Sequence, residues 1–230
     1  MNILTVKKVN TGHLIFLISF LILVMLSLTL IVLNNRVTAS EILEKKGNMS
    51  APKIHTHMSG EKGIFANAYL IESQNGVVLI DSTLTESESK ALRSEVVSIN
   101  KPLLAIILTH PHPDHVAGVT NLVTSPKVPI ISLESVARIM NATEEAKRIQ
   151  WTPVFGKEWI SKWTYPNQYV KDLDTVTFDG ITYKVYDFGP GGDSDANSVW
   201  VMENGSNVAF VGDLVFNGYH PYIADDHISD

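Results

Sequence analysis

The chain has 230 residues, of which 45% are hydrophobic and 18% are charged, so it is long enough for one substantial core or for one domain with a tail. It contains no cysteine, which excludes disulfides, thiolate metal sites and a cysteine nucleophile. Residues 1–39 carry three bases and no acid, which leaves 15 of the 18 bases against all 24 acids in the remainder, and this acidic balance argues against nucleic acid as the partner.

An apolar segment near the N-terminus predicts a membrane helix. Residues 14–33 form a run of 20 residues without charge, glycine or proline, which is long enough to span a bilayer. Lys7 and Lys8 precede the run, and lysine on the near side predicts that the remainder lies outside the cell membrane. Val37 and Ala39 also suit a signal-peptidase site, with cleavage before Ser40. We therefore expect residues 1–39 to be either an uncleaved single-pass anchor on a bacterial cell, with an extracytoplasmic domain, or a signal peptide cleaved near Ala39 to give a secreted or periplasmic protein.

A polar linker is predicted between this segment and the folded domain. Residues 40–60 contain turn formers, and we expect the domain to occupy residues 61–230. His55 and His57 form a His-x-His pair within this linker, which we interpret as part of a surface loop.

The predicted domain alternates β-hairpins with helices. Two runs rich in β-forming residues flank an Asn-Gly pair at 75–76, which predicts a hairpin. Residues 85–100 have helical spacing, and residues 103–109 are a continuous apolar run, as expected of a strand buried on both faces. An Asp-Gly pair at 179–180 predicts a second hairpin. The remaining predicted elements are helices at 115–123 and 133–150 and strands at 128–131, 198–203 and 208–213. Together these elements predict a mixed α/β sandwich.

Residues 110–115 read HPHPDH and concentrate three of the eight histidines of the chain. His110 and His112 each precede a proline, a position that avoids the helical conformation, so both are predicted to be extended and to share one face. Asp114 suits a helix start, and His115 then lies in the first helical turn. One short segment thus offers two pairs of ligands in two directions, and imidazole with carboxylate suits zinc, iron or manganese.

The stretch LTHPHPDHVAG resembles the H-x-H-x-D-H signature of the metallo-β-lactamase-fold hydrolase superfamily. AYLIES and GVVLIDS before it and FVGDLVF after it agree with this resemblance, which covers residues 64–218. It implies an αββα fold with a site for two metal ions. By the pattern of the family, one metal binds His110 and His112, the other binds Asp114 and His115, and Asp213 bridges them. Asp81, which ends its predicted strand, is then expected to hold the ligand side chains in place without binding a metal itself.

The chain departs from the family pattern at the third histidine, which the family supplies in a G-x-G-H-[ST] loop. Here the corresponding stretch is FGPGGDSDANSVW, at 188–200, without a histidine. Asp193, preceded by Gly192, is the best match, and it is either a ligand or a solvated loop acid. Asn197 is predicted either to orient this loop or to face the substrate.

A second departure concerns the last histidine ligand of the family. His220 and His227 are the only histidines after Asp213, and they follow it too closely to be the usual ligand. His220 is interpreted either as a residue lining the pocket or as a surface histidine. The closing strand and helix of the family architecture have no counterpart in the sequence, so the domain is expected to be incomplete at its C-terminus.

Three tryptophans, Trp151, Trp159 and Trp163, come at or after the end of the predicted helix at 133–150. Aromatic side chains in such a position form an apolar wall above a site, pack in the core or make a membrane-facing patch, and the sequence leaves these three interpretations open.

The leading hypothesis for function is a metal-dependent hydrolase with two zinc ions per chain. A zinc-activated water would attack the ester, thioester, lactone or lactam carbonyl of a small molecule, and Asp114 would orient it as the catalytic residue. Because the resemblance places Asp213 rather than a cysteine at the bridging position, we favour thioesters and lactones over penicillins.

Two other functions remain open at this stage. His110, His112 and Asp193 would also make a facial set for a single iron, as in the sulfur dioxygenases of the same superfamily. If the domain is incomplete, the chain is instead a membrane-tethered, non-catalytic remnant.

Overall fold

The computed structural model describes residues 51–123, 125–203, 207–216 and 218, together with Met25, Ser27, Thr29 and Ile31, which are helical. The rest of the predicted apolar helix at 14–33, the cleavage position near Ala39, and both His220 and His227 lie outside the described residues. Among the residues that are described, no helix has the length and apolar character needed to cross a membrane. The chain divides into two compact units, Met1–Met49 and Ser50–Asp230, and the second contains all the elements below.

Six strands form the first sheet, in the order β1-β2-β3-β4-β5-β6. Strands β1, β2 and β3 pair antiparallel, and β3 to β6 pair parallel. The hairpin predicted around the Asn-Gly pair is therefore confirmed as β2–β3. Strand β3 is buried along its whole length, because one face meets helices and the other meets the second sheet. The bounds are β1 Lys53–Met58, β2 Asn67–Glu72, β3 Val77–Ile80, β4 Leu103–Ile107, β5 Ile130–Leu133 and β6 Gln168–Val170.

Four antiparallel strands form the second sheet, in the order β10-β9-β8-β7. Strand β8 buries alternate residues, Ile181, Tyr183 and Val185, as expected of a sheet with one face in the core. Trp200 of β9 is fully buried. The predicted second hairpin is confirmed as β7–β8. The bounds are β7 Thr175–Phe178, β8 Ile181–Gly191, β9 Ser194–Glu203 and β10 Val208–Phe210.

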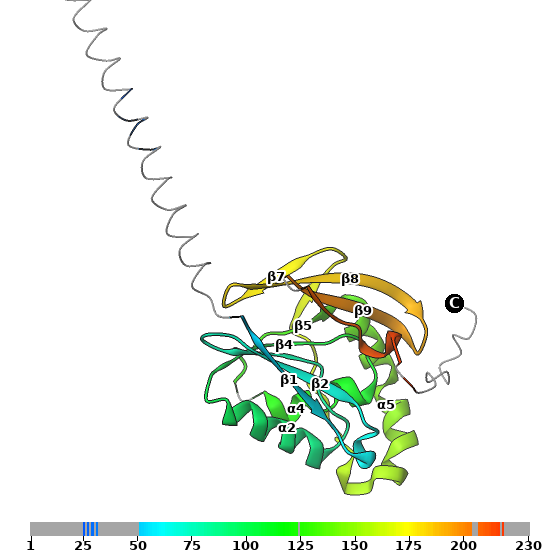
Figure 1. The fold of residues 1–230 in the computed structure, drawn as a ribbon. Coiled ribbons are helices and arrows are strands. Elements are labelled where there is room, and N and C mark those ends of the chain that lie inside the picture. Colours follow the sequence, from blue (N-terminus) through cyan, green and yellow to red (C-terminus); the bar gives the residue numbers. More distant parts are fainter. Residues whose placement is uncertain are drawn as a thin grey trace, which may run out of the picture. The chain divides into compact units, whose positions relative to one another are not determined.

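Helices α2 and α4 lie on the side of the first sheet away from the second sheet (Figure 1), whereas α5 contacts β5 of the first sheet and β9 of the second. Helix α2 begins after Thr85, whose hydroxyl accepts a hydrogen bond from the N–H of Glu88, and it buries Leu92 and Val96. The helices are α2 Glu86–Ser98, α3 Pro113–Val116, α4 Val119–Leu122 and α5 Glu134–Phe155. Three short 3-10 helices complete the described elements: η1 Glu61–Gly63, η2 Gly156–Glu158 and η3 Gly212–Leu214. The predicted mixed α/β sandwich is confirmed.

Two predictions about the course of the chain are wrong. The expected linker at 40–60 contains edge strand β1, so His55 and His57 lie on a strand and not in a loop. His55 is exposed, and His57 is buried. Strand β1 buries only His57, and its hydrophobic signal is therefore weak, but backbone pairing with β2 along its whole length makes it a strand. The stretch within 188–200 that corresponds to the ligand loop of the family is also mostly strand, because β8 and β9 continue pairing to Gly191 and Ser194.

Candidate metal centre

The HPHPDH segment lies at the C-terminal end of β4 and runs directly into α3. His112 has φ −67° and ψ 144°, an extended conformation, and it is the N-cap of α3, which starts at Pro113. Asp114 and His115 fall in the first turn of α3, as predicted. The ring of His110 lies 5.0 Å from the ring of His112 and 4.1 Å from the ring of His115, between centroids. All three imidazoles are buried side by side.

Asp81 follows β3 and reaches the same place from the neighbouring parallel strand. Its Oδ1 accepts a hydrogen bond from the N–H of Thr109 at 2.8 Å, and its Oδ2 accepts from the Thr109 hydroxyl at 2.7 Å and from Nδ1 of His115 at 3.0 Å. Asp81 has φ 59°, a left-handed conformation that aspartate tolerates better than most residues. This carboxylate is a hydrogen-bond acceptor behind the cluster.

These hydrogen bonds decide which nitrogen of each imidazole is available as a ligand. Because Thr109 gives its hydroxyl proton to Asp81, its oxygen is left to accept from Nδ1 of His110, at 3.0 Å. His115 likewise donates from Nδ1 to Asp81. Both histidines therefore direct Nε2 to the interior of the cluster, the orientation that carboxylate or hydroxyl partners impose on metal-binding histidines. Sequence reasoning missed Thr109, whose only signal is its place directly before His110.

The β8–β9 hairpin brings Asp193 to the cluster. Gly191 pairs with Ser194, so Gly192 and Asp193 form the turn, and Gly192 has φ 60°, a conformation that favours glycine. Asp193 is only 1% exposed, and its Oδ2 lies 2.9 Å from Nδ1 of His112. Asp193 is therefore not a solvated loop acid.

Asn197 orients this turn from the following strand. Its side-chain N–H groups donate to the carbonyls of Gly189, Gly191 and Ser194 at 3.1, 2.8 and 2.9 Å. Because all three carbonyls belong to the hairpin end, Asn197 holds the backbone that carries Asp193.

Asp213 enters from η3, after β10. Its Oδ1 lies 3.3 Å from Nε2 of His115, and Oδ2 of Asp114 lies at the same distance from that nitrogen. Gly212 makes the approach possible, because a Cβ there would lie 2.7 Å from the Thr109 hydroxyl oxygen and 3.1 Å from Nδ1 of His110. Any other residue at 212 would push η3 away from the cluster.

Three groups of the described residues place their ligand atoms within 4.8 Å of one another. In one of them, Asp81 with His110 and His115, the carboxylate already accepts hydrogen bonds from Thr109 and His115. The other two are adjoining ligand sets: His110, His112 and Asp193 make the first, and Asp114, His115 and Asp213 make the second. Nε2 of His110 and Oδ1 of Asp193 are buried without a hydrogen-bond partner. Leaving such atoms unpaired costs about 1–3 kcal/mol each, and a cation between them removes that cost. Imidazole and carboxylate together are donors for zinc, iron or manganese, so the residues fit a divalent metal.

The electrostatics of the cluster agree with this interpretation. Burial, together with the neighbouring His115 and His112, holds the pKa of His110 well below its ordinary value, so His110 is a neutral imidazole, the form that binds metals. Burial opposes a charge on His115 as well, but the carboxylates of Asp114, Asp213 and Asp81 outweigh it and raise the pKa of His115 well above normal. The second set therefore attracts positive charge, which a proton or a metal ion can supply.

The first ligand set also favours a cation beside it. Burial raises the pKa of Asp193, although His112 partly opposes this shift. A buried carboxylate with a raised pKa is stabilised in its charged form by a metal ion in contact with it.

Comparison with known proteins gives one family and a common fold. A family model described as the metallo-beta-lactamase superfamily matches residues 62–229. The chain is 31% identical over 112 residues to the uncharacterized protein YobT of Bacillus subtilis (strain 168), covering 48% of each protein. It is 28% identical over 169 residues to the beta-lactamase-like protein 2 homolog of Caenorhabditis elegans, covering 68% of this chain and 49% of that protein. The chain therefore spans about half the length of these relatives.

Among solved structures, the BLEG-1 B3 metallo-beta-lactamase superposes with a TM-score of 0.56 at 20% identity, covering 72% of this chain and 74% of that one. At this identity the likeness concerns the fold.

Proposed function

The chain belongs to the metallo-beta-lactamase superfamily, and from that premise we propose that it is a hydrolase whose two ligand sets each hold a zinc ion. The observation that carries the proposal is the convergence of His110, His112 and Asp193 beside Asp114, His115 and Asp213, with buried ligand atoms that have no partner in the protein. The first three residues would hold one ion and the second three the other.

The chemistry that zinc supplies when bound is a water of pKa about 7 and polarisation of a carbonyl oxygen. The residues around it have separate tasks. Asp81 and Thr109 fix the His110 and His115 rings with Nε2 inward. Burial raises the pKa of Asp114, but His115 outweighs it and lowers the pKa, so the carboxylate is ionised. It would orient the attacking water by accepting a hydrogen bond from it. Asp114 is the residue we assign to catalysis.

We further propose that the substrate is a small ester, thioester or lactone. The support is the carboxylate of Asp213, rather than a thiolate, beside His115 in the second ligand set. Hydrolysis of a lactone, a thioester and a cephalosporin should be compared with the full chain loaded with zinc. We expect the lactone or the thioester to turn over fastest, and rapid turnover of the cephalosporin alone would reverse this order.

A second candidate function is favoured by the composition of the first ligand set. Two histidines and one carboxylate with open positions are also the ligands of non-haem iron enzymes. The alternative is a redox enzyme that holds a single iron at His110, His112 and Asp193. The metal content of the purified protein distinguishes it from the hydrolase.

Metal content after growth in medium with equal zinc and iron distinguishes these two functions. Under the hydrolase proposal the purified full chain contains zinc and consumes no oxygen with substrate. Iron together with oxygen consumption would support the redox enzyme instead. The variant Asp193→His serves as the matched control, because it exchanges the carboxylate for imidazole, and its zinc-to-iron ratio should be at least as high as that of the wild type.

A further inference from the structure

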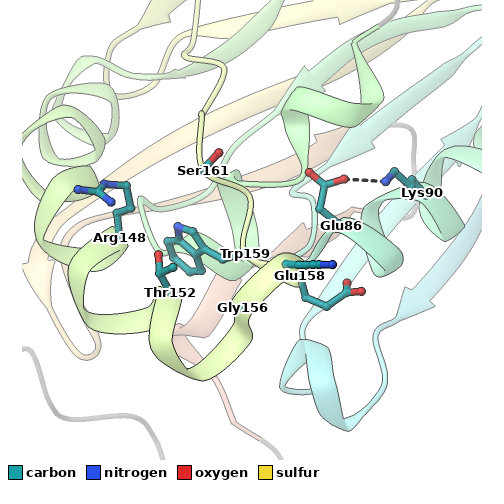
Figure 2. Close-up of a pocket in the computed structure, with 9 residues that line it drawn as sticks. Glu86, Lys90, Arg148, Thr152, Gly156, Glu158, Trp159 and Ser161 are labelled. Carbon is teal, nitrogen blue, oxygen red and sulfur yellow. Dashed lines mark ion pairs between the residues drawn. The ribbon is translucent and has the colours of Figure 1, made fainter.

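A pocket of about 560 Å³ lies between the first turn of α2, the end of α5 and η2, and it contains no residue of either ligand set (Figure 2). Its charged side chains include two that are held in ion pairs. Lys90 pairs with Glu86 at 2.8 Å, as Figure 2 shows, and Arg148 pairs with Glu145. The unpaired polar group that bears on the proposed reaction lies elsewhere, on β2, and it is the hydroxyl of Tyr69.

Tyr69 lies near the end of the first sheet at which the metal centre forms. It pairs with Ile80, the last residue of β3, and Asp81 follows Ile80 directly. Opposite residues of an antiparallel pair have their side chains on the same face, with Cβ atoms about 5 Å apart. The register therefore places Tyr69 beside the residue that precedes Asp81, whose carboxylate accepts the hydrogen bond of His115.

The ring of Tyr69 packs against Phe210, at the end of β10. The two ring centroids are 5.3 Å apart and the rings are tilted by 55°, a favourable arrangement for an aromatic pair. Because Phe210 belongs to the second sheet, this contact directs the Tyr69 side chain into the layer between the sheets. Phe210 comes three residues before Asp213, so the ring lies between the strand ends that carry Asp81 and Asp213.

The hydroxyl of Tyr69 is available as a hydrogen-bond donor. It makes no hydrogen bond to any of the described residues, and its oxygen is open to solvent. Burial raises the pKa of Tyr69, and the carboxylates of Asp81 and Asp213 raise it too, although His115 opposes them. The phenol therefore keeps its proton at neutral pH, and the action of these three charges on it agrees with a place beside the ligand sets.

Other side-chain donors around the cluster already have acceptors. The hydroxyl of Thr109 donates to Asp81, and the hydroxyl of Ser198 donates to the carbonyl of Thr109 at 2.7 Å. The amide of Asn197 donates to three carbonyls of its own hairpin. Tyr69 therefore differs from these described neighbours, because its proton is left for a bound molecule.

We propose that Tyr69 contacts the substrate of the proposed hydrolase, and that its hydroxyl donates a hydrogen bond to the carbonyl oxygen of the bond that is cleaved. This role rests on the proposed function. The carbonyl oxygen gains negative charge as water adds to the carbon, and a donor held in place stabilises that charge more than it stabilises the neutral carbonyl. Tyr69 keeps its proton throughout. Esters, thioesters and lactones all carry this oxygen, so the role is the same for each.

Tyr69→Phe tests this role, because it removes the hydroxyl and keeps the ring against Phe210. In the full chain loaded with zinc, kcat for the fastest substrate should fall by about 10- to 100-fold, the loss expected for one hydrogen bond to a charged oxygen. KM should change much less, because the hydrogen bond strengthens in the transition state. Metal content and the urea midpoint should match the wild type, whereas a packing role alone would lower the midpoint and leave kcat unchanged.

Binding of phenylphosphonate gives a second measurement that needs no turnover. Its tetrahedral, charged oxygens resemble those of a carbonyl group under attack by water. By calorimetry on the zinc-loaded chain, Tyr69→Phe should bind phenylphosphonate about tenfold more weakly than the wild type. Tyr186→Phe is the matched control, because Tyr186 alternates with the buried Val185 on β8 and its ring lies 5.3 Å from Nζ of Lys184. This control should change neither kcat nor the affinity for phenylphosphonate.

The outcomes separate the role of Tyr69 from the proposed function. If Tyr69→Phe keeps the kcat and the phenylphosphonate affinity of the wild type, the role of Tyr69 is wrong and the hydrolase stands. If the wild type binds zinc and phenylphosphonate but hydrolyses no substrate, the proposed function is wrong, and the affinity of Tyr69→Phe decides whether Tyr69 contacts a bound ligand. A wild type that binds neither zinc nor phenylphosphonate would overturn both.

Discussion

Replacing both His110 and His112 with alanine should remove the metal of the first ligand set and lower hydrolysis by about a thousandfold or more, which corresponds to about 4 kcal/mol of transition-state stabilisation. The two imidazoles are two of the three ligands of that set, and Asp193 alone does not hold a metal ion. The measurements are metal content by mass spectrometry and hydrolysis of the best substrate from the comparison above.

His55→Ala is the matched control, because it removes an exposed imidazole that pairs with Glu72 on the surface. Metal content and activity should be unchanged in this control. A double variant that keeps the metal content of the wild type would contradict the assignment of the first ligand set, whatever its activity.

Asp81→Ala should lower the free energy of unfolding by about 3–5 kcal/mol, the usual effect of removing one partner from a buried network. The change leaves the N–H and hydroxyl of Thr109 and Nδ1 of His115 without their acceptor. It also places alanine at φ 59°, where a residue other than glycine is strained. Urea unfolding of the metal-free protein measures this effect.

Asp81→Asn separates the hydrogen bonds from the charge. Asparagine keeps the shape and tolerates the left-handed conformation, so the loss of stability should be smaller than in Asp81→Ala. Metal affinity should still fall by about 10- to 100-fold, because His115 loses the carboxylate that orients it. Glu203→Ala, an exposed carboxylate at the end of β9, is the control. If Asp81→Ala unfolds at the same urea concentration as this control, the supporting role of Asp81 is wrong.

The local features of the site could be predicted because short stretches of sequence determine them. Two prolines restrict His110 and His112 to extended conformations, and Pro113 and Asp114 start a helix that carries His115. The β2–β3 and β7–β8 hairpins follow from Asn-Gly and Asp-Gly pairs in the same way. The choice of imidazole and carboxylate already limits the chemistry to metals of the zinc, iron and manganese type.

Other features could not be predicted because their signal lies in a distant partner. Strand β1 has a polar sequence and becomes a strand through its pairing with β2. Thr109 has no distinctive pattern, and its role depends on Asp81, 28 residues away.

The sequence by itself determined the ligand types, the conformation of the HPHPDH segment and the alternation of hairpins and helices, since these depend on interactions between residues close along the chain. Only the tertiary structure decided that Asp193 is buried against His112 and that Asp213 lies beside His115. The physical reason is that Asp193 and Asp213 come from the second sheet, whereas the histidines follow a strand of the first. Stacking of the two sheets brings these carboxylates to the imidazoles, and the Gly192 turn and the close approach of Gly212 place them there.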